Sequence, residues 1–289
     1  SAEALHTTLF GEPLRLAITS GRSRDEDLPQ TVVSFEGRAH TDRLLEWSQQ
    51  PAVAFLKGDI DYQARVELTH RPADSQDDDR RVALAFSSDL EGVAIDLPAP
   101  YGKGPASARS THLNLIFGTE TSLIDLHYGD LANALVQLNN DGYEIRRANL
   151  ALGQAAELPG GRRLHLSGRL DRFDWPLWQD VWERYQARAQ ALGKDSEQQA
   201  ERLQALLDDD LQLSARVHLD QHQLGSLLLE NILLGVSSGP DGWSLRFAND
   251  IVKGQLDGLG GSARYLWGWS ICTCSPRFCS SCPVRASKR

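Results

Sequence analysis

Apolar and polar residues alternate with a period of two along most of the chain. The alternation is clearest over residues 211–219, where Leu213, Ala215 and Val217 are separated by the polar residues Ser214 and Arg216. It recurs at 82–86, 93–97, 113–117, 124–128, 164–170 and 243–247. Because successive side chains of a β-strand point to opposite faces, each segment is predicted to form a strand with one apolar and one polar face.

Turn-forming residues separate the predicted strands. Asn-Asp-Gly at 140–142, Pro-Gly-Gly at 159–161 and Gly-Pro-Asp-Gly at 239–242 are typical of hairpins and loops. Most neighbouring strands follow each other with no helix between them, which favours an antiparallel meander over parallel β–α–β units. The sequence therefore predicts a mainly β fold, an extended antiparallel sheet with a few short helices.

Two segments have the apolar spacing of a helix. Residues 41–50 are predicted to form a short helix that Pro51 ends. In the second helix Asp174 can cap the start, and the pattern breaks near Gly193, before a further helix predicted from Asp195. We expect one stripe of the second helix to be buried against the edge or mouth of the sheet, so that Trp182→Ala costs roughly 3–5 kcal/mol. That stripe comprises Trp178, Val181, Trp182 and Tyr185.

The charge of the chain argues against one class of partner. Its 289 residues carry 30 basic and 39 acidic side chains, a formal net charge of −9. Five of the basic residues follow Gly261, so residues 1–260 hold 25 basic and 39 acidic side chains, a balance of −14. Binding to nucleic acid needs concentrated Lys and Arg, and no nucleic-acid partner is expected.

The sequence also lacks features of a complete precursor. It contains no methionine and begins in the middle of an alternating pattern. It has neither an apolar run of about 18 residues nor the pattern of a signal peptide. These observations favour an internal fragment of a longer protein, whose export signal or anchor lies upstream.

Two pairs of carboxylates are weak candidates for catalysis. Asp59 and Asp61 have the spacing of an acid–base pair, but charges at alternate positions are routine on the exposed face of a strand. Asp171 and Asp174 flank the start of a predicted helix, where capping is the better explanation. We expect the protein not to be an enzyme.

The candidates for a metal or cofactor site are equally weak. His218 and His222 bracket Asp220 near a strand end, without the spacing of a helical metal site or a further placed ligand. The glycines at 258, 260 and 261 lack the strand–helix context of a dinucleotide-binding loop. We expect neither a metal nor a cofactor.

Residues 261–289 differ in composition from the rest of the chain. They contain no acidic residue and all four cysteines, Cys272, Cys274, Cys279 and Cys282. A shifted reading of the codons for 268–274 gives Leu-Glu-His/Tyr-Leu-His/Tyr-Leu, which restores the alternation. We predict a frameshifted, disordered tail without function, which leaves the sheet an unpaired edge near 251–256. A zinc knuckle on the four cysteines is the alternative.

Four stretches resemble one protein family. They are SDLEGVAIDLPAPYGK at 88–103, FDWPLW at 173–178, GWSLRF at 242–247 and VKGQL at 252–256. Over about residues 1–260 the chain resembles the YhdP central region, within the AsmA-like superfamily of Gram-negative bacteria. The resemblance implies a long curved antiparallel β-sheet groove over 1–172 with a short helix near 41–50. A helical insertion at 173–210 and a β-hairpin continuation of the groove at 211–260 follow, before the aberrant tail at 261–289.

The resemblance also implies a function. Such a protein is anchored in the inner membrane, and its periplasmic groove conducts phospholipids toward the outer membrane without catalytic residues. The partners implied are phospholipid acyl chains, the membrane through the N-terminal anchor of the parent protein, and unidentified envelope proteins. Twelve alternating apolar residues are the expected lining of the groove: Val82, Leu84, Phe86, Leu113, Leu115, Phe117, Leu164, Leu166, Leu213, Val217, Leu245 and Phe247.

Three alternatives remain open on the sequence. The same apolar residues would be buried against protein in a β-sandwich. A scaffold or assembly factor of outer-membrane biogenesis needs the apolar face to be filled, whereas a lipid conduit needs it continuous and open. A hydrolase needs a polar pocket with convergent carboxylates.

Overall fold

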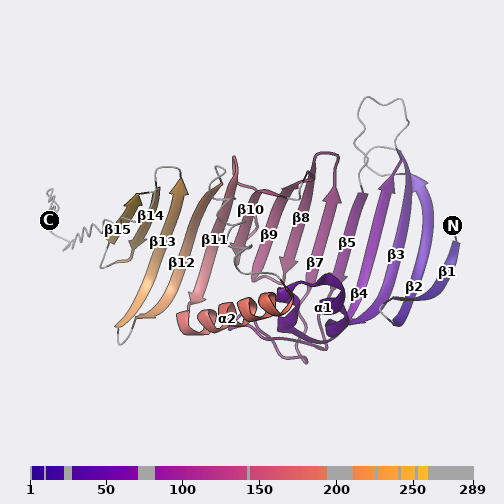
Figure 1. Cartoon of the computed structure of the whole chain (residues 1–289), viewed down its shortest axis with the longest axis horizontal. Helices are drawn as coiled ribbons and strands as arrows, with labels where there is room; N and C mark the ends of the chain where they lie inside the picture. The colour runs from indigo at the N-terminus through magenta and orange to yellow at the C-terminus, as the bar shows by residue number, and fades with distance from the viewer. Residues whose placement is uncertain are drawn as a thin grey trace.

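The computed structural model describes residues 2–9, 11–22, 28–70, 82–141, 144–193, 211–224, 227–239, 242–250 and 253–259. Within them, fifteen strands form one open sheet, seen as a long row of strands in Figure 1. The strands are β1 (Ala2–Leu9), β2 (Glu12–Arg22), β3 (Pro29–His40), β4 (Leu56–Thr69), β5 (Val82–Ser88), β6 (Val93–Ile95), β7 (Thr111–Phe117), β8 (Thr121–Tyr128), β9 (Ala132–Asn139), β10 (Ile145–Leu152), β11 (Arg163–Arg172), β12 (Gln212–Leu224), β13 (Leu227–Gly239), β14 (Gly242–Ala248) and β15 (Lys253–Leu259).

The strands lie in the sheet in the order of the chain, apart from β6, which pairs only with the first residues of β4. The predicted mainly β fold is confirmed, and most neighbouring strands are antiparallel, as expected. The pairs β10–β11 and β11–β12 are parallel, which the sequence did not predict. A parallel neighbour requires a crossover. The segment 153–162 supplies the first, and the segment that includes the helix α2 (Trp175–Ala191) supplies the second.

Gly168 is the residue that allows β10 and β11 to pair as they do. It lies opposite Leu152 with a φ of 118°, a conformation that side chains disfavour. A Cβ atom at this position would collide with the carbonyl oxygen of Leu152. The parallel pairing therefore depends on a glycine inside the strand.

Two helical segments follow β3. The helix α1 (Thr41–Ser48) begins after His40, whose Nδ1 accepts a hydrogen bond from the Asp42 backbone N–H at 3.3 Å. The 3₁₀-helix η1 (Pro51–Phe55) comes next, with Pro51 at its start. The predicted helix at 41–50 is therefore present, two residues shorter at its C-terminal end.

The second predicted helix corresponds to α2. Asp174 occupies its N-cap position but its side chain makes no capping hydrogen bond, contrary to expectation. The helix ends at Ala191, and Gly193 follows with a φ of 69°, which agrees with the predicted break. The further helix predicted from Asp195 and the tail from 261 lie outside the described residues. The predicted domain boundaries stay predictions, although strands from both sides of α2 join one sheet.

The helices and one loop gather at one end of the strands, where Figure 1 shows α1 and α2 lying across the sheet. We call this part the ledge, and define it as residues 41–55, 89–105 and 175–191. It packs on the sheet through a cluster of Ile60, Leu90, Val93 and Ile95, all less than 8% exposed. Leu44 of α1 contacts the same cluster. The main buried core of this part of the chain therefore sits between the ledge and the ends of the strands.

Candidate functional site

The register of the sheet aligns apolar residues from strand to strand. Because directly paired residues share a face, the pairings can be followed across the whole sheet. One row of paired residues crosses all fourteen strands of the main path and is apolar at every position. It comprises Leu5, Leu16, Phe35, Ala64, Phe86, Leu113, Leu126, Ala134, Leu150, Leu166, Ala215, Val236, Leu245 and Leu256. We call this the apolar row, and the side of the sheet that carries it the apolar face.

All twelve residues predicted to line a groove lie on the apolar face. Leu84 is paired with Leu115, and Leu164 with both Ala148 and Leu213, in a second row beside the first. The expectation that these residues share one face of one sheet is confirmed. Their contact with lipid stays a prediction.

Most of the apolar face is uncovered in the described part of the chain. The extensive contacts of each strand from β7 to β15 are with its neighbours in the sheet. Phe117 is 40% exposed, Leu150 43% and Val236 38%, although all three are large apolar residues. The face is therefore the surface of a single layer here, and no second layer of a β-sandwich covers it among the residues described.

Two places on the apolar face are covered. The ledge covers the ends of β4, β5 and β8, where Tyr62, Phe86 and Tyr128 contact its buried cluster. Farther along the sheet Val217 is 5% exposed, in a cluster that Leu166 and Phe173 also contact. Val217, expected to line the groove, is thus covered by protein near the start of α2.

The loop of the ledge is held in place by one lysine. The ammonium of Lys103 donates to the carbonyl oxygens of Leu90, Val93 and Ser107 at 2.5–2.7 Å and to that of Gly104 at 3.3 Å. Burial lowers the pKa of Lys103, because desolvation disfavours its charge. This side chain replaces the regular hydrogen bonding that an irregular loop lacks.

A second cation ties the ledge to the sheet. The guanidinium of Arg109 donates to the carbonyl oxygens of Pro100 and Tyr101 and to the Tyr128 hydroxyl, all within 3.1 Å. It also lies 4.9 Å from the centre of the Tyr128 ring. On the other side, Arg184 of α2 bonds Asp96 at 2.8 Å. The ledge is thus a fixed part of the fold.

The opposite face of the sheet is mostly polar, although Ile116 and Leu233 on it are 39% and 45% exposed. The row that neighbours the apolar row in sequence includes Arg15, Glu36, Gln63, Ser87 and His112, paired in that order. These five residues line a cavity of about 600 Å³. This cavity was not predicted, since alternation alone does not show where a surface is hollowed.

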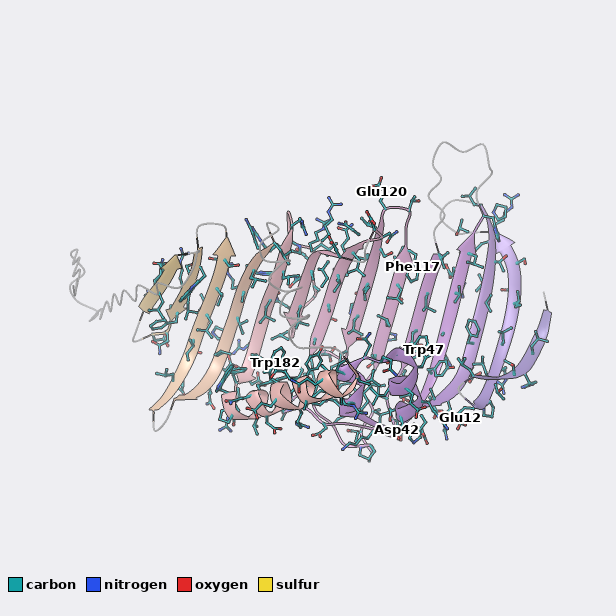
Figure 2. The ribbon with its side chains drawn as sticks, in the orientation of Figure 1. Glu12, Asp42, Trp47, Phe117, Glu120 and Trp182 are labelled. Atoms are coloured by element: carbon teal, nitrogen blue, oxygen red, sulfur yellow. The ribbon has the colours of Figure 1, made fainter. Side chains whose placement is uncertain are left out.

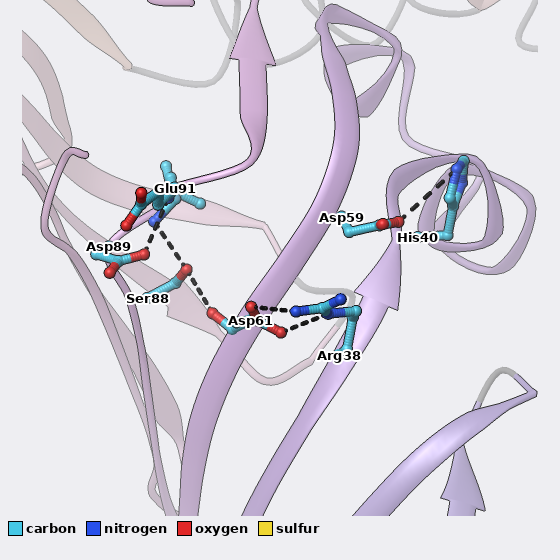
Figure 3. A network of polar contacts seen from close by, with 8 residues as sticks. Arg38, His40, Asp59, Asp61, Ser88, Asp89 and Glu91 are labelled. Carbon is cyan, nitrogen blue, oxygen red and sulfur yellow. Dashed lines mark hydrogen bonds and ion pairs between the residues drawn. The ribbon is translucent and has the colours of Figure 1, made fainter. Parts of the chain in front are cut away.

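Two carboxylates around this cavity, those of Asp61 and Glu36, are engaged in ion pairs. Asp61 accepts two hydrogen bonds from Arg38, both at 2.7 Å, as Figure 3 shows. Those bonds hold the pKa of Asp61 below its usual range. Glu36 is paired with Arg15 at 3.1 Å. Ionised carboxylates bound to arginine do not form the convergent acid–base pair of a hydrolase.

The residues considered as weak catalytic candidates make ion-pair contacts with neighbouring side chains. Asp59 lies opposite His40, 3.8 Å away, whereas Asp61 is bound to Arg38 (Figure 3). His218 contacts Asp220 at 3.1 Å, and Arg169 binds the same carboxylate at 2.8 Å. Within the described residues no three His, Cys, Asp or Glu side chains form a group suited to a metal ion. The glycines 260 and 261 and the side chain of His222 lie outside that description.

A comparison with known protein families assigns the chain to one of them. A family model described as YhdP protein matches residues 1–262. The chain belongs to the YhdP family. The YhdP match thus spans the entire described sheet and both edges of the apolar row. No curated protein and no solved structure matches the chain.

YhdP proteins are envelope proteins, generally with a transport role that involves no catalysis. None of the helices described in this YhdP chain is long and apolar enough to cross a membrane. Membership of a family of transport proteins makes the apolar face, rather than the polar cavity, the candidate functional site.

Sequence reasoning missed how the ledge presents its aromatic residues. The stripe on α2 was expected to be buried, but Trp182 is 54% exposed and stacks on Tyr185 at 5.7 Å. Trp178 does contact the ledge loop, with its ring 5.8 Å from that of Tyr101. The expectation for Trp182 is wrong because α2 packs mainly on η1, at the ends of the strands, and not on the sheet itself.

Proposed function

We propose that this YhdP chain is a segment of an inner-membrane-anchored periplasmic protein that conducts phospholipids between the inner and outer membranes along its apolar face. The observation that carries the proposal is the apolar row, which has no polar residue on any of fourteen strands. Outside the two places that protein covers, this face is partly exposed, and an apolar surface of that length is unusual for a protein domain and supports a partner or ligand that covers it.

The chemistry of an acyl chain matches this surface. Burial of each methylene group contributes roughly 0.8 kcal/mol, and the contribution has no directional requirement. A lipid can therefore lie at any position along the row with similar free energy. That property suits conduction, because a molecule that binds equally well at successive positions is not trapped at one of them.

The alternative is a scaffold whose apolar face is covered by another envelope protein. It predicts that the purified chain carries no lipid. The conduit predicts bound phospholipid, detectable by mass spectrometry of the purified chain.

A charge placed on the apolar face tests the proposal. Leu115 lies in the second apolar row, paired with Leu84 and Ile124, and Leu115→Asp would place a carboxylate against the acyl chains. Ile116→Asp is the matched control, because Ile116 is the next residue along the strand, lies on the opposite face, is 39% exposed and is paired with Ala83 and Leu123. We expect Leu115→Asp to lose the bound phospholipid and Ile116→Asp to keep it, with unchanged circular dichroism in both.

Transfer in cells provides a second measurement. The same two changes in the full-length parent should block phospholipid flux to the outer membrane in the first case and leave it normal in the second. Retention of lipid and normal flux in folded Leu115→Asp would contradict the conduit.

A further inference from the structure

The ledge carries exposed aromatic residues beside the apolar face. On α2, Trp175 is 60% exposed and Trp182 54%; on α1, Trp47 is 70% exposed. Trp175 and Trp182 are seven residues apart, two turns of the helix, so they project from the same side of α2. Three exposed tryptophans thus lie on two helices of one ledge.

Trp47 and Trp182 lie at the boundary between the ledge and the open strands, and Trp175 is on the same side of α2 as Trp182. The ledge packs on the apolar face, since its buried cluster contacts Tyr62, Phe86 and Tyr128 of that face. Figure 2 shows Trp47 and Trp182 along the side of the ledge nearer the middle of the strands, whereas Asp42 lies on the far side. The aromatic residues therefore stand where the apolar surface ends and the polar ledge begins.

Tryptophan suits such a boundary. Its ring is apolar and its indole N–H is a hydrogen-bond donor, which is why tryptophan concentrates at the level of lipid headgroups in membranes. We propose that the ledge holds the polar ends of the lipids that the apolar face carries, with their glycerol esters beside Trp47, Trp175 and Trp182. The inference rests on the proposed function and adds to it the orientation of the lipid.

The dimensions of the strands agree with this orientation. Strand β7 has seven residues and β8 has eight, which corresponds to about 24–27 Å along the strand. The hydrocarbon region of one membrane leaflet is about 15 Å thick, half of a bilayer core. Acyl chains that start at the ledge therefore lie within the length of the strands and point toward Phe117 at the far end (Figure 2).

Quenching of tryptophan fluorescence by spin-labelled lipid tests the orientation. The chain is loaded from vesicles of phosphatidylcholine that carries a nitroxide either near the glycerol, at acyl carbon 5, or near the chain end, at carbon 16. We expect the nitroxide near the glycerol to quench more strongly. Trp182→Phe and Trp47→Phe should each reduce that difference, because they remove residues close to the ester level.

Trp243→Phe is the matched control. Trp243 belongs to the apolar face, but at the start of β14, which is the strand end remote from the ledge. Its removal should leave the preference for the carbon-5 label intact or increase it. Stronger quenching by the carbon-16 label, or equal quenching by both, in a chain that does carry lipid would overturn the orientation and leave the conduit standing. Absence of bound lipid would overturn the proposed function itself.

Discussion

The same alternating pattern leads to different burial of apolar residues at the two ends of the strands. At the ledge end, Ile60 of β4 is 5% exposed, in contact with Val93 and Ile95. Toward the other end, Phe117 on the same face remains 40% exposed. Alternation therefore determines which face is apolar, whereas the ledge determines where that face becomes protein core. The difference separates residues that stabilise the fold from residues available to a ligand.

The largest effect expected from this comparison is on stability. Ile60→Ala should cost about 2–5 kcal/mol, since it opens a cavity in the core under the ledge. Ile124→Ala, the same change on the partly exposed strand β8, should cost about 1 kcal/mol, because water or ligand fills the space. Urea unfolding of the lipid-free chain measures both values. Equal costs would mean that the apolar face is covered throughout.

The second effect concerns the loop of the ledge. Lys103→Met keeps much of the side-chain volume but removes the donor shared by four carbonyl oxygens, and should cost about 2–3 kcal/mol. Hydrogen exchange should show the loss of protection within residues 89–105 and unchanged protection in β8 and β9. Global unfolding instead would show that the sheet depends on the ledge for its stability.

Trp182→Ala is expected to have a smaller effect. The side chain is 54% exposed and contacts Tyr185 by stacking, so its removal should cost about 1 kcal/mol. This value replaces the larger cost that the sequence pattern predicted. A thermal denaturation curve displaced as far as that of Ile60→Ala would place Trp182 in a core.

The smallest effect is a dependence on pH. His165 of β11 lies on the polar face, where burial and the nearby Arg163 lower its pKa. A depressed histidine pKa favours the neutral form in the folded state, so this contribution is complete above the unfolded pKa of about 6.5 and is lost as the pH falls below it. His165→Gln should therefore reduce the loss of stability between pH 7 and pH 5, measured as the difference in melting temperature. An equal loss of stability in the unchanged chain and in His165→Gln would show that His165 is not the source of the pH dependence.

The sequence predicts the strands and their faces well, and for one reason. Pairing between strands must keep apolar residues together, so the alternation that identifies Leu113 and Leu115 also aligns them with Phe86 and Leu84. Alternation does not depend on strand direction, and the parallel pairs β10–β11 and β11–β12 could not be predicted from it. They depend on connections and on a glycine at 168, whose requirement appears only when Leu152 lies beside it.

The ledge could not be predicted from the sequence, for a different reason. Residues 93–97 alternate like a strand of the main sheet, yet β6 covers only Val93–Ile95 and folds over the apolar face. The carbonyl oxygens of this segment are bound by Lys103, an arrangement between residues distant in the sequence that has no local pattern. The predicted unpaired edge near 251–256 stays a prediction, because β15 is the last strand of the described sheet and the residues after 259 lie outside the description.

The length of the apolar row has a consequence for how transport would proceed. Fourteen strands at a spacing of about 4.8 Å extend over roughly 60 Å, twice the hydrocarbon thickness of a bilayer. Under the proposed function, a lipid in the middle is some 30 Å from either edge and has neighbours on both sides. Movement along such a row is a single-file queue, in which a molecule that enters at one edge displaces another at the opposite edge. The rate of delivery would then depend on how fully the row is occupied, and a half-empty row would delay the first arrival.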